Sequence, residues 1–387
     1  MSTARSLLII GGGAIGSAIA AKLAQRPDWQ GRISVLERDA SYAQASSALS
    51  AASIRQQFST PLNIALSQYG LAWLRQHGQA AQLVEQGYLY LADSDAGAAT
   101  LQRLHAIQRA HGADVLLLDR TALAQRWPWL RTQDLTLASW GRSGEGWFDG
   151  WALLQTLKQQ AQAAGVQYLH DEALALERDV SGAISGVHTA TGLLQADHYV
   201  LACGAWSGKL AATAGLHVPV SARRRSVYVL RSAETAPHCP LVIDPSGLWF
   251  RPEGEFGGQG QFLCGGPPLD DAPDLPLDPD PTLFEEQLWP ALAARVPGFE
   301  SLRLQRAWAG YYEMNDVDHN GLVGALDACP NLLLACGFSG HGLQHAPGVG
   351  RGVAEWLACG HYQTLDLSPL SPARIAAGRP YLELNVI

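Results

Sequence analysis

The sequence has few lysines, no basic stripe and no long hydrophobic run, and each absence excludes a class of function. Only Lys22, Lys158 and Lys209 occur, and the formal net charge is −8 with scattered arginines, which argues against a nucleic-acid-binding surface. No apolar run approaches the ~20 residues of a membrane span. Because the chain runs from Met1 almost directly into its first predicted strand, we expect no signal peptide and a cytoplasmic protein.

Cysteine is also sparse and is not spaced for a metal site. The six cysteines form no CxxC pair and have no histidine at a zinc-ligand spacing, so we expect free thiols and no metal. What remains is a chain of 387 residues, 47% hydrophobic and 16% charged, which is enough to bury the cores of two or three domains.

The most informative segment lies between residues 7 and 37. It reads as an apolar strand, a glycine-rich turn, an Ala-rich helix and a second strand that ends at Glu37. Gly11 allows the tight turn, Gly13 lets the backbone approach a pyrophosphate, and Gly16 lets the helix pack closely on the sheet. The positive end of the helix suits the phosphates, and Glu37 can accept hydrogen bonds from a ribose diol. This pattern predicts a dinucleotide site.

We expect a single dinucleotide, because no second turn of this kind follows a strand. The glycines at 348, 350 and 352 fall within a predicted helix instead. A bound NAD would be the diffusing hydride carrier, whereas a bound FAD would have to pass its electrons to another acceptor. The glycine pattern alone leaves this choice open.

The rest of the chain alternates between two kinds of strand. Residues 199–206 and 332–336 are apolar and precede glycines, which indicates further passes through the nucleotide domain. Residues 226–230 and 248–251 are separated by turn residues and suit an antiparallel sheet. The segment 265–281 holds five Asp and six Pro, which is typical of a solvated loop rather than a metal site.

Several motifs together resemble the D-amino-acid oxidase and sarcosine oxidase superfamily of FAD enzymes over nearly the whole chain. They are the fingerprint of residues 11–37, Ser46-Ser47, Ser53–Arg55, Ala202–Ser207, Trp308–Gly310 and Gly337–Gly342. Gln56–Ser59, Trp308–Asn315 and Gly337–Gly350 are similar, more specifically, to sarcosine oxidase beta-type and proline dehydrogenase subunits.

The resemblance implies an α/β fold with two interleaved domains. A Rossmann-like FAD-binding domain would comprise residues 1–85, 147–220 and 307–387. A substrate-binding domain of α+β type, built on a mixed sheet, would comprise residues 86–146 and 221–306.

The same resemblance implies one FAD, held without a covalent bond. Relatives with covalent flavin use a His or a Cys where this chain has Ser50 and Gly310, and neither side chain can form the bond. The ADP half, the pyrophosphate, the adenine and the isoalloxazine ring are each assigned contacts by the family pattern. The implied cofactor-binding residues are Gly11, Gly13, Ala14, Ile15, Gly16, Glu37, Arg38, Ser46, Ser47, Ala173, Gly204, Trp206, Gly340, His341, Gly342, Leu343 and Gln344.

The family reaction removes a hydride from the carbon next to an amine and delivers it to flavin N5, and water then hydrolyses the imine. Arg55 stands where sarcosine-type relatives place an Arg for the substrate carboxylate, but their partner Lys is Gln344 here. Arg251 and the run Arg223–Arg225 could restore positive charge, although such a run is more often a solvated strand edge.

Three further side chains complete the candidate set. Tyr228 and Tyr312 are pocket walls or hydroxyl donors, with core aromatics as the alternative, and His341 lies between two glycines beside the expected flavin ring. The candidate catalytic residues are His341, Arg55, Tyr228, Arg251 and Tyr312.

The implied partners are an amine or amino-acid substrate (N-methyl, cyclic or D-amino acid) and an electron acceptor: a quinone, an electron-transfer protein or oxygen. Some oxidases of the family activate oxygen with a Lys near the flavin, and no Lys follows Lys209, which favours a dehydrogenase. The alternative is a low-turnover FAD-bearing assembly factor or a subunit of a larger oxidoreductase complex.

Overall fold

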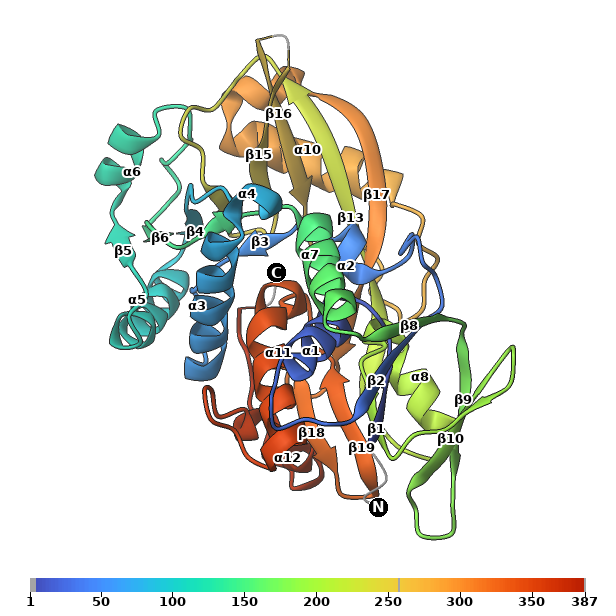
Figure 1. Cartoon of the computed structure of the whole chain (residues 1–387). Helices are drawn as coiled ribbons and strands as arrows, with labels where there is room; N and C mark the ends of the chain where they lie inside the picture. Colours follow the sequence, from blue (N-terminus) through green and yellow to red (C-terminus); the bar gives the residue numbers. More distant parts are fainter. Residues whose placement is uncertain (1–4, 257, 386–387) are drawn as a thin grey trace.

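The computed structural model describes residues 5–256 and 258–385, and it has the mixed α/β architecture that the sequence predicts. A six-stranded sheet occupies the lower half of Figure 1 and an eight-stranded sheet the upper half. The long strands β13 (Val220–Ser232) and β17 (Arg303–Asn315) extend from the upper part toward the lower one.

The six-stranded sheet is assembled from distant parts of the chain. The first strand is central, and its neighbours on both sides run parallel to it, so their carboxyl ends meet at one edge. Only the edge strand that follows residue 321 is antiparallel. In order, the strands are β18 (Leu322–Leu326), β19 (Cys329–Cys336), β12 (His198–Leu201), β1 (Ser6–Ile10), β2 (Arg32–Glu37) and β8 (Gln167–His170).

Helices cover this sheet and share its largest buried cluster. A Cβ added at Gly350 would lie 2.7 Å from Ala18, so small residues let two of these helices approach closely. The apolar spacing of the sequence accounts for their buried faces. The four long helices of this layer are α1 (Ala14–Ala24), α3 (Pro61–Gln76), α7 (Gly150–Ala163) and α11 (Gly342–Cys359).

The eight-stranded sheet is mixed. Its strands pair antiparallel except β14 with β4, and a separate cluster of buried aromatic and aliphatic side chains lies against it. The expected domain boundary at residue 306 falls within β17, whose whole length pairs with β13. In order, the strands are β17, β13, β16 (Gln259–Gly265), β15 (Trp249–Phe256), β14 (Leu241–Ile243), β4 (Tyr88–Ala92), β6 (Leu137–Gly141) and β5 (Val115–Leu118).

The remaining strands and α-helices range from two residues in β3 to 16 in α5. The strands are β3 (Ser53–Ile54), β7 (Gly146–Trp147), β9 (Ala173–Arg178), β10 (Ile184–Thr189) and β11 (Leu193–Leu194). The helices are α2 (Ser46–Leu49), α4 (Gly78–Ala81), α5 (Asp95–Ala110), α6 (Arg120–Arg126), α8 (Ser207–Ala212), α9 (Pro281–Leu283), α10 (Trp289–Arg295) and α12 (Ala373–Ala376).

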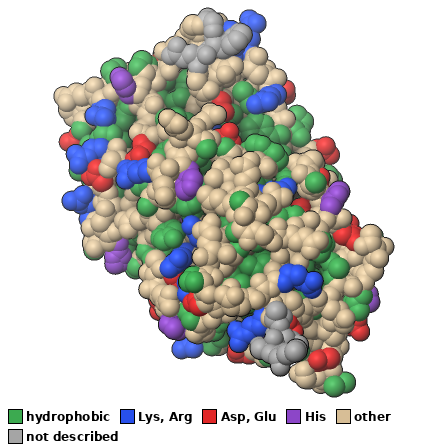
Figure 2. Space-filling model, in the orientation of Figure 1, with side chains coloured by type: hydrophobic (Ala, Val, Ile, Leu, Met, Phe, Trp, Pro, Cys, Tyr) green, Lys and Arg blue, Asp and Glu red, His purple; other side chains and the backbone are tan. Residues whose placement is uncertain are grey.

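The face of the molecule drawn in Figure 2 agrees with the charge pattern of the sequence. On the face drawn in Figure 2, Lys and Arg side chains are scattered among acidic and uncharged ones and form no continuous basic area. Within residues 5–256 and 258–385, no helix has both the length and the apolar character that crossing a membrane requires.

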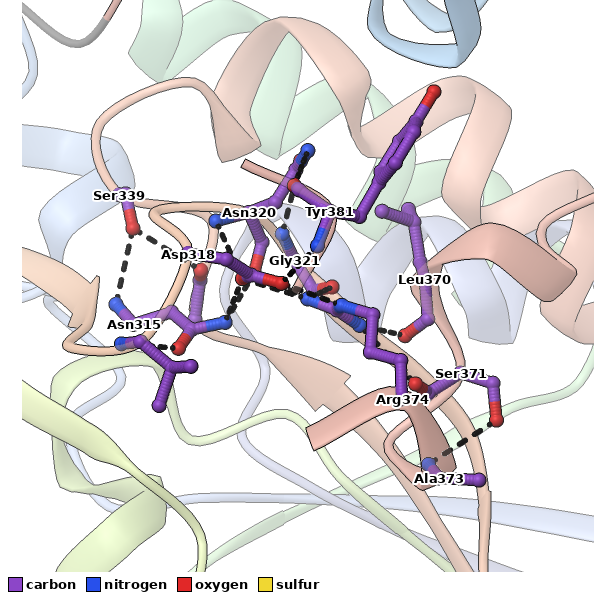
Figure 3. Close-up of polar contacts among 12 residues, drawn as sticks. Asn315, Asp318, Asn320, Gly321, Ser339, Leu370, Ser371, Ala373, Arg374 and Tyr381 are labelled. Atoms are coloured by element: carbon purple, nitrogen blue, oxygen red, sulfur yellow. Dashed lines mark hydrogen bonds and ion pairs between the residues drawn. The ribbon is translucent and has the colours of Figure 1, made fainter. Parts of the chain in front are cut away.

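The C-terminal segment is fixed by a buried ion pair, drawn in Figure 3. The guanidinium of Arg374 donates to both carboxylate oxygens of Asp318, at 2.7 and 3.0 Å. Asp318 also accepts from the side-chain amide of Asn315, at 2.7 Å, and from the backbone N–H of Tyr381. Both charged side chains are almost fully buried, so each provides the counter-charge that water cannot provide there.

Candidate active site

A cavity of about 440 Å³ opens at the carboxyl end of β1 and extends toward β13 and β17. It lies where the six-stranded sheet, α2, the start of α11 and the eight-stranded sheet meet, so segments from the whole chain contribute to its walls. Of the residues proposed from the sequence, those that line it are Gly11, Gly13, Ala14, Ile15, Glu37, Arg38, Ser46, Ser47, Arg55, Ala173, Gly204, Trp206, Tyr312, Gly340, Gly342, Leu343 and Gln344.

The glycine turn has the geometry that its sequence requires. Gly11 has a φ of +101°, which favours glycine, and a Cβ at Gly16 would lie 1.9 Å from the Gly11 carbonyl oxygen. Gly16 therefore lies behind the turn rather than on the cavity wall. At Gly13, the nearest atom to an added Cβ would be the Ser47 hydroxyl oxygen at 3.4 Å, on the cavity side. The start of α1 is thus open to an anionic ligand.

One end of the cavity suits the adenosine half of a dinucleotide. Glu37 Oε2 accepts from the Gly12 N–H at 2.8 Å and Oε1 from the Asp39 N–H at 3.0 Å, which fixes the carboxylate at the cavity wall. The Arg38 guanidinium stacks over the Trp206 ring at 3.9 Å. This leaves a fixed acceptor for ribose hydroxyls beside an apolar surface for a base.

The middle of the cavity has an unsatisfied hydroxyl. Ser46 Oγ is buried and has no hydrogen-bond partner among the described residues, although it lines the cavity together with Ser47. A buried hydroxyl without a partner is costly, and a pyrophosphate oxygen would satisfy it. The residues present therefore fit FAD, and the glycines of the turn leave room for its phosphates.

The loop before α11 forms the opposite wall. Gly340 has a φ of +93°, and a Cβ there would lie 2.4 Å from the Tyr312 ring, so this ring packs directly on the Gly340 backbone. Gln344 Oε1 accepts from the Arg55 N–H at 2.9 Å and from the Ser67 hydroxyl at 3.1 Å. These hydrogen bonds hold the first turn of α11 against β3 and α3.

Glu313 was not among the residues proposed from the sequence. Its Oε2 accepts from the Gly337 N–H at 2.9 Å, and its carboxyl lines the cavity near Gly342. Burial raises the pKa of Glu313 to about 7, with backbone N–H groups acting in the opposite direction. The only sequence signal for this residue is its place directly after Tyr312 in a motif read for its aromatic residues.

His341 is not where the sequence placed it. Its side chain does not line the cavity, and its ring contacts Phe58 and His345 edge-on, with centroids 5.5 and 5.0 Å away. Both ring nitrogens are buried without a partner in the described part of the chain. Burial, with the nearby Arg55 charge, lowers the pKa of His341 to about 3, so the ring is neutral. Its neighbours Gly340 and Gly342 line the cavity, whereas His341, the residue directly before α11, has its side chain buried in the interior.

Tyr228 and Arg251 also lie away from the cavity. Tyr228 belongs to the buried cluster of the eight-stranded sheet, and its hydroxyl donates to the Asp280 carbonyl. It is therefore a core aromatic, because alternation along β13 directs it to the face opposite Arg225 and Tyr312. Arg251 is buried. It forms an ion pair with Glu253 and donates to the Ala51 carbonyl at 2.9 Å, so its charge is balanced within the protein.

Three comparisons with known proteins agree with this geometry. The family model described as "FAD dependent oxidoreductase" (DAO) matches residues 6–356. The chain is 38% identical to FAD-dependent oxidoreductase domain-containing protein 1 of Xenopus laevis, over 98% of this chain and 84% of that protein. It is 39% identical to the protein of the same name from Bos taurus, over 96% and 85% of the two chains.

Solved structures give the same result. L-proline dehydrogenase from P. horikoshii superimposes with a TM-score of 0.85 at 25% identity, over 98% of this chain and all of that one. Glycine oxidase from Geobacillus kaustophilus superimposes with a TM-score of 0.79 at 25% identity, over 95% and 98% of the two chains. The chain described by these sequence and structural features belongs to the DAO family of FAD-dependent oxidoreductases.

Proposed function

We propose that this oxidoreductase oxidises a carbon–nitrogen bond of an amino acid or secondary amine: an N-methyl, cyclic or D-amino acid. The observation that carries the proposal is the aromatic end of the cavity, where Tyr88, Trp249 and Tyr312 line the space next to the loop before α11. The names of the structural neighbours, L-proline dehydrogenase and glycine oxidase, support the same substrate class.

Bound FAD would supply the hydride acceptor in this reaction. Gly11, Gly13, Glu37, Ser46 and Ser47 are proposed to hold its ADP half and pyrophosphate.

The start of α11 has a distinct electrostatic role in the proposal. The 18-residue helix begins at Gly342, and its first residues line the cavity. Their N–H groups and the helix dipole stabilise negative charge that develops on reduction of a group bound there. Gln344 supports this role because its side chain fixes the first helical turn.

The cavity walls favour a neutral amine. Burial raises the pKa of Tyr88 to about 12, so its phenol remains protonated and is a hydrogen-bond donor rather than a base. An amine that enters this partly apolar space loses hydration, which lowers its pKa and favours the unprotonated form that can lose hydride. No dedicated strong base is needed in this scheme.

Anaerobic bleaching of bound flavin tests the proposal. The purified yellow protein is mixed with sarcosine, L-proline, D-amino acids and N-methyl amino acids in turn, with lactate as a control that lacks an amine. We expect at least one amine to bleach the flavin and lactate to leave it oxidised. If dithionite reduces the flavin but no amine does, the low-turnover alternative replaces this function.

A further inference from the structure

Arg55, the arginine that sequence resemblance assigned to a substrate carboxylate, is already occupied in the structure. Its Nη1 donates to the Gln57 carbonyl at 3.1 Å and to the Tyr90 hydroxyl at 3.0 Å. Its Nη2 donates to the Asn385 carbonyl of the C-terminal segment, and the guanidinium lies over the Phe58 ring at 4.0 Å. Most of its donors therefore hold protein groups in place.

Arg225 is another arginine on the cavity wall, and fewer of its N–H groups donate hydrogen bonds to the protein. In the register of β13 and β17 it lies opposite Gly310, so Arg225 and Tyr312 are diagonal neighbours on the same sheet face. The guanidinium carbon lies 5.2 Å from the Tyr312 ring centroid. Because Tyr312 packs on Gly340, this charge is placed beside the loop before α11.

The present counter-ion of Arg225 comes from the Pro- and Asp-rich loop of residues 266–280. Asp271 Oδ1 accepts from Arg225 Nη1 at 2.6 Å, and the same nitrogen donates to the Arg224 carbonyl. Among residues 5–256 and 258–385, these are the hydrogen bonds of the Arg225 guanidinium, which leaves Nε and Nη2 available. The Asp271 side chain is 49% exposed, so water and dissolved anions reach this pair.

The loop itself is fastened along the first part of β13, which does not pair with β16, independently of this ion pair. The Asp274 N–H donates to the Ala222 carbonyl at 2.9 Å, and the Asp280 N–H donates to the Ser226 hydroxyl at 3.0 Å. The Tyr311 hydroxyl donates to the Leu275 carbonyl at 2.6 Å. Asp271 can therefore leave Arg225 without release of the whole loop.

We propose that Arg225 binds the carboxylate of the substrate and that Asp271 is the internal anion which this carboxylate displaces. The assignment rests on the proposed function for the identity of the substrate as an amino acid. A carboxylate offers two oxygens to the planar guanidinium fork, whereas Asp271 engages only Nη1. Because the Asp271 side chain is half exposed, water can solvate it when an incoming carboxylate takes its place on Arg225.

Carboxylate titration of the FAD-loaded protein tests the assignment without turnover. Acetate is added while the absorption spectrum of the bound flavin is recorded, and the dissociation constant is compared among variants at constant ionic strength. We expect Arg225→Met to weaken acetate binding about tenfold or more, Arg225→Lys to weaken it less, and Asp271→Asn to strengthen it several-fold.

Arg224→Met is the matched control. Arg224 is the next residue on β13 but pairs with Asp280 and the Asp278 carbonyl, so its loss should leave acetate binding unchanged. Flavin content and far-UV circular dichroism verify folding, and Asp271→Asn keeps the test informative if Arg225→Met loses FAD. Unchanged acetate affinity in Arg225→Lys and Asp271→Asn, or no saturable spectral change in the wild type, would overturn the proposal.

The substrate assay separates this inference from the proposed function. If an amino acid bleaches the flavin and Arg225→Met leaves its KM unchanged, the Arg225 assignment fails and the function stands. If acetate binds through Arg225 and no amine bleaches the flavin, the anion site stands and the proposed function fails. When both hold, Arg225→Met should raise KM for the amino acid much more than it lowers kcat.

Discussion

The Ser339 hydroxyl accepts a hydrogen bond from the Asn315 N–H at 3.0 Å and thereby ties the end of β17 to the loop before α11. The Asn315 side chain continues this connection to Asp318, and Asp318 continues it to Arg374 (Figure 3). A wall of the cavity thus depends on an ion pair in the C-terminal segment.

Removal of one partner from this ion pair should be costly. We expect Arg374→Ala to lower the free energy of unfolding by about 3–5 kcal/mol, because it leaves the Asp318 carboxylate buried without its counter-ion. Urea denaturation of the apoprotein measures the loss. Asp28→Ala, which removes an exposed partner of Arg26, is the control and should lower the stability far less. Equal losses of unfolding free energy in the two variants would show that the buried ion pair contributes no more than the exposed one.

Glu37 should contribute to FAD affinity. Glu37→Gln removes the charged acceptor at the ribose end, and a hydrogen bond to a charged group is worth about 1.5–3 kcal/mol, so we expect FAD to bind about tenfold to a hundredfold more weakly. Quenching of flavin fluorescence on titration of apoprotein measures this affinity. An unchanged dissociation constant would rule out a ribose contact.

Glu313 should make stability depend on pH. Burial raises the pKa of Glu313 to about 7 in the folded protein, whereas the unfolded chain releases this proton in the usual carboxyl range. Between these two values the folded protein holds a proton that the unfolded chain does not, and this proton stabilises the fold. This contribution is therefore complete at low pH and is lost as the pH rises through about 7. Relative to Glu313→Gln, the wild type should lose about 2–3 kcal/mol of unfolding free energy between pH 5 and pH 8. Parallel pH profiles for the two proteins would contradict the assignment.

Tyr228 and Tyr312 should differ in their effects. Tyr228→Phe removes a hydroxyl bonded to the Asp280 carbonyl, so we expect a stability loss of about 1 kcal/mol and an unchanged spectrum of bound flavin. Tyr312→Phe keeps the ring on Gly340, whereas Tyr312→Ala removes a cavity wall and should perturb that spectrum. A spectral change in Tyr228→Phe would return this residue to the site.

FAD should be released by denaturation. Neither Ser50 nor Gly310, which both line the cavity, can form the covalent link used by some relatives. Acid precipitation should therefore leave the yellow colour in the supernatant. Colour in the pellet would show a covalent attachment elsewhere.

Local sequence was sufficient for the fold class and for the glycine turn, because the positive φ of Gly11 and the close approach of Gly16 to the Gly11 carbonyl arise within the turn itself. It was insufficient for His341 and Tyr228. Their side-chain directions depend on where a helix begins and on which face of β13 meets the cavity, and both follow from long-range pairing. The sequence predicted correctly that Arg55 lies at the cavity, but it did not predict the contacts of its guanidinium, because the partner Asn385 lies 330 residues away.

The order of strands in the six-stranded sheet also bears on biosynthesis. The first strand pairs with residues 198–201 on one side, and these pair in turn with residues 332–334. Loop-closure entropy makes such pairings late events, and a growing polypeptide folds as its segments emerge. The sheet that contains the nucleotide-binding turn therefore cannot be completed until residues 332–334, more than 300 positions after the turn, have been synthesised. Chains truncated before residue 332 should not retain flavin, and the unpaired edge of their β12 strand should bind chaperones.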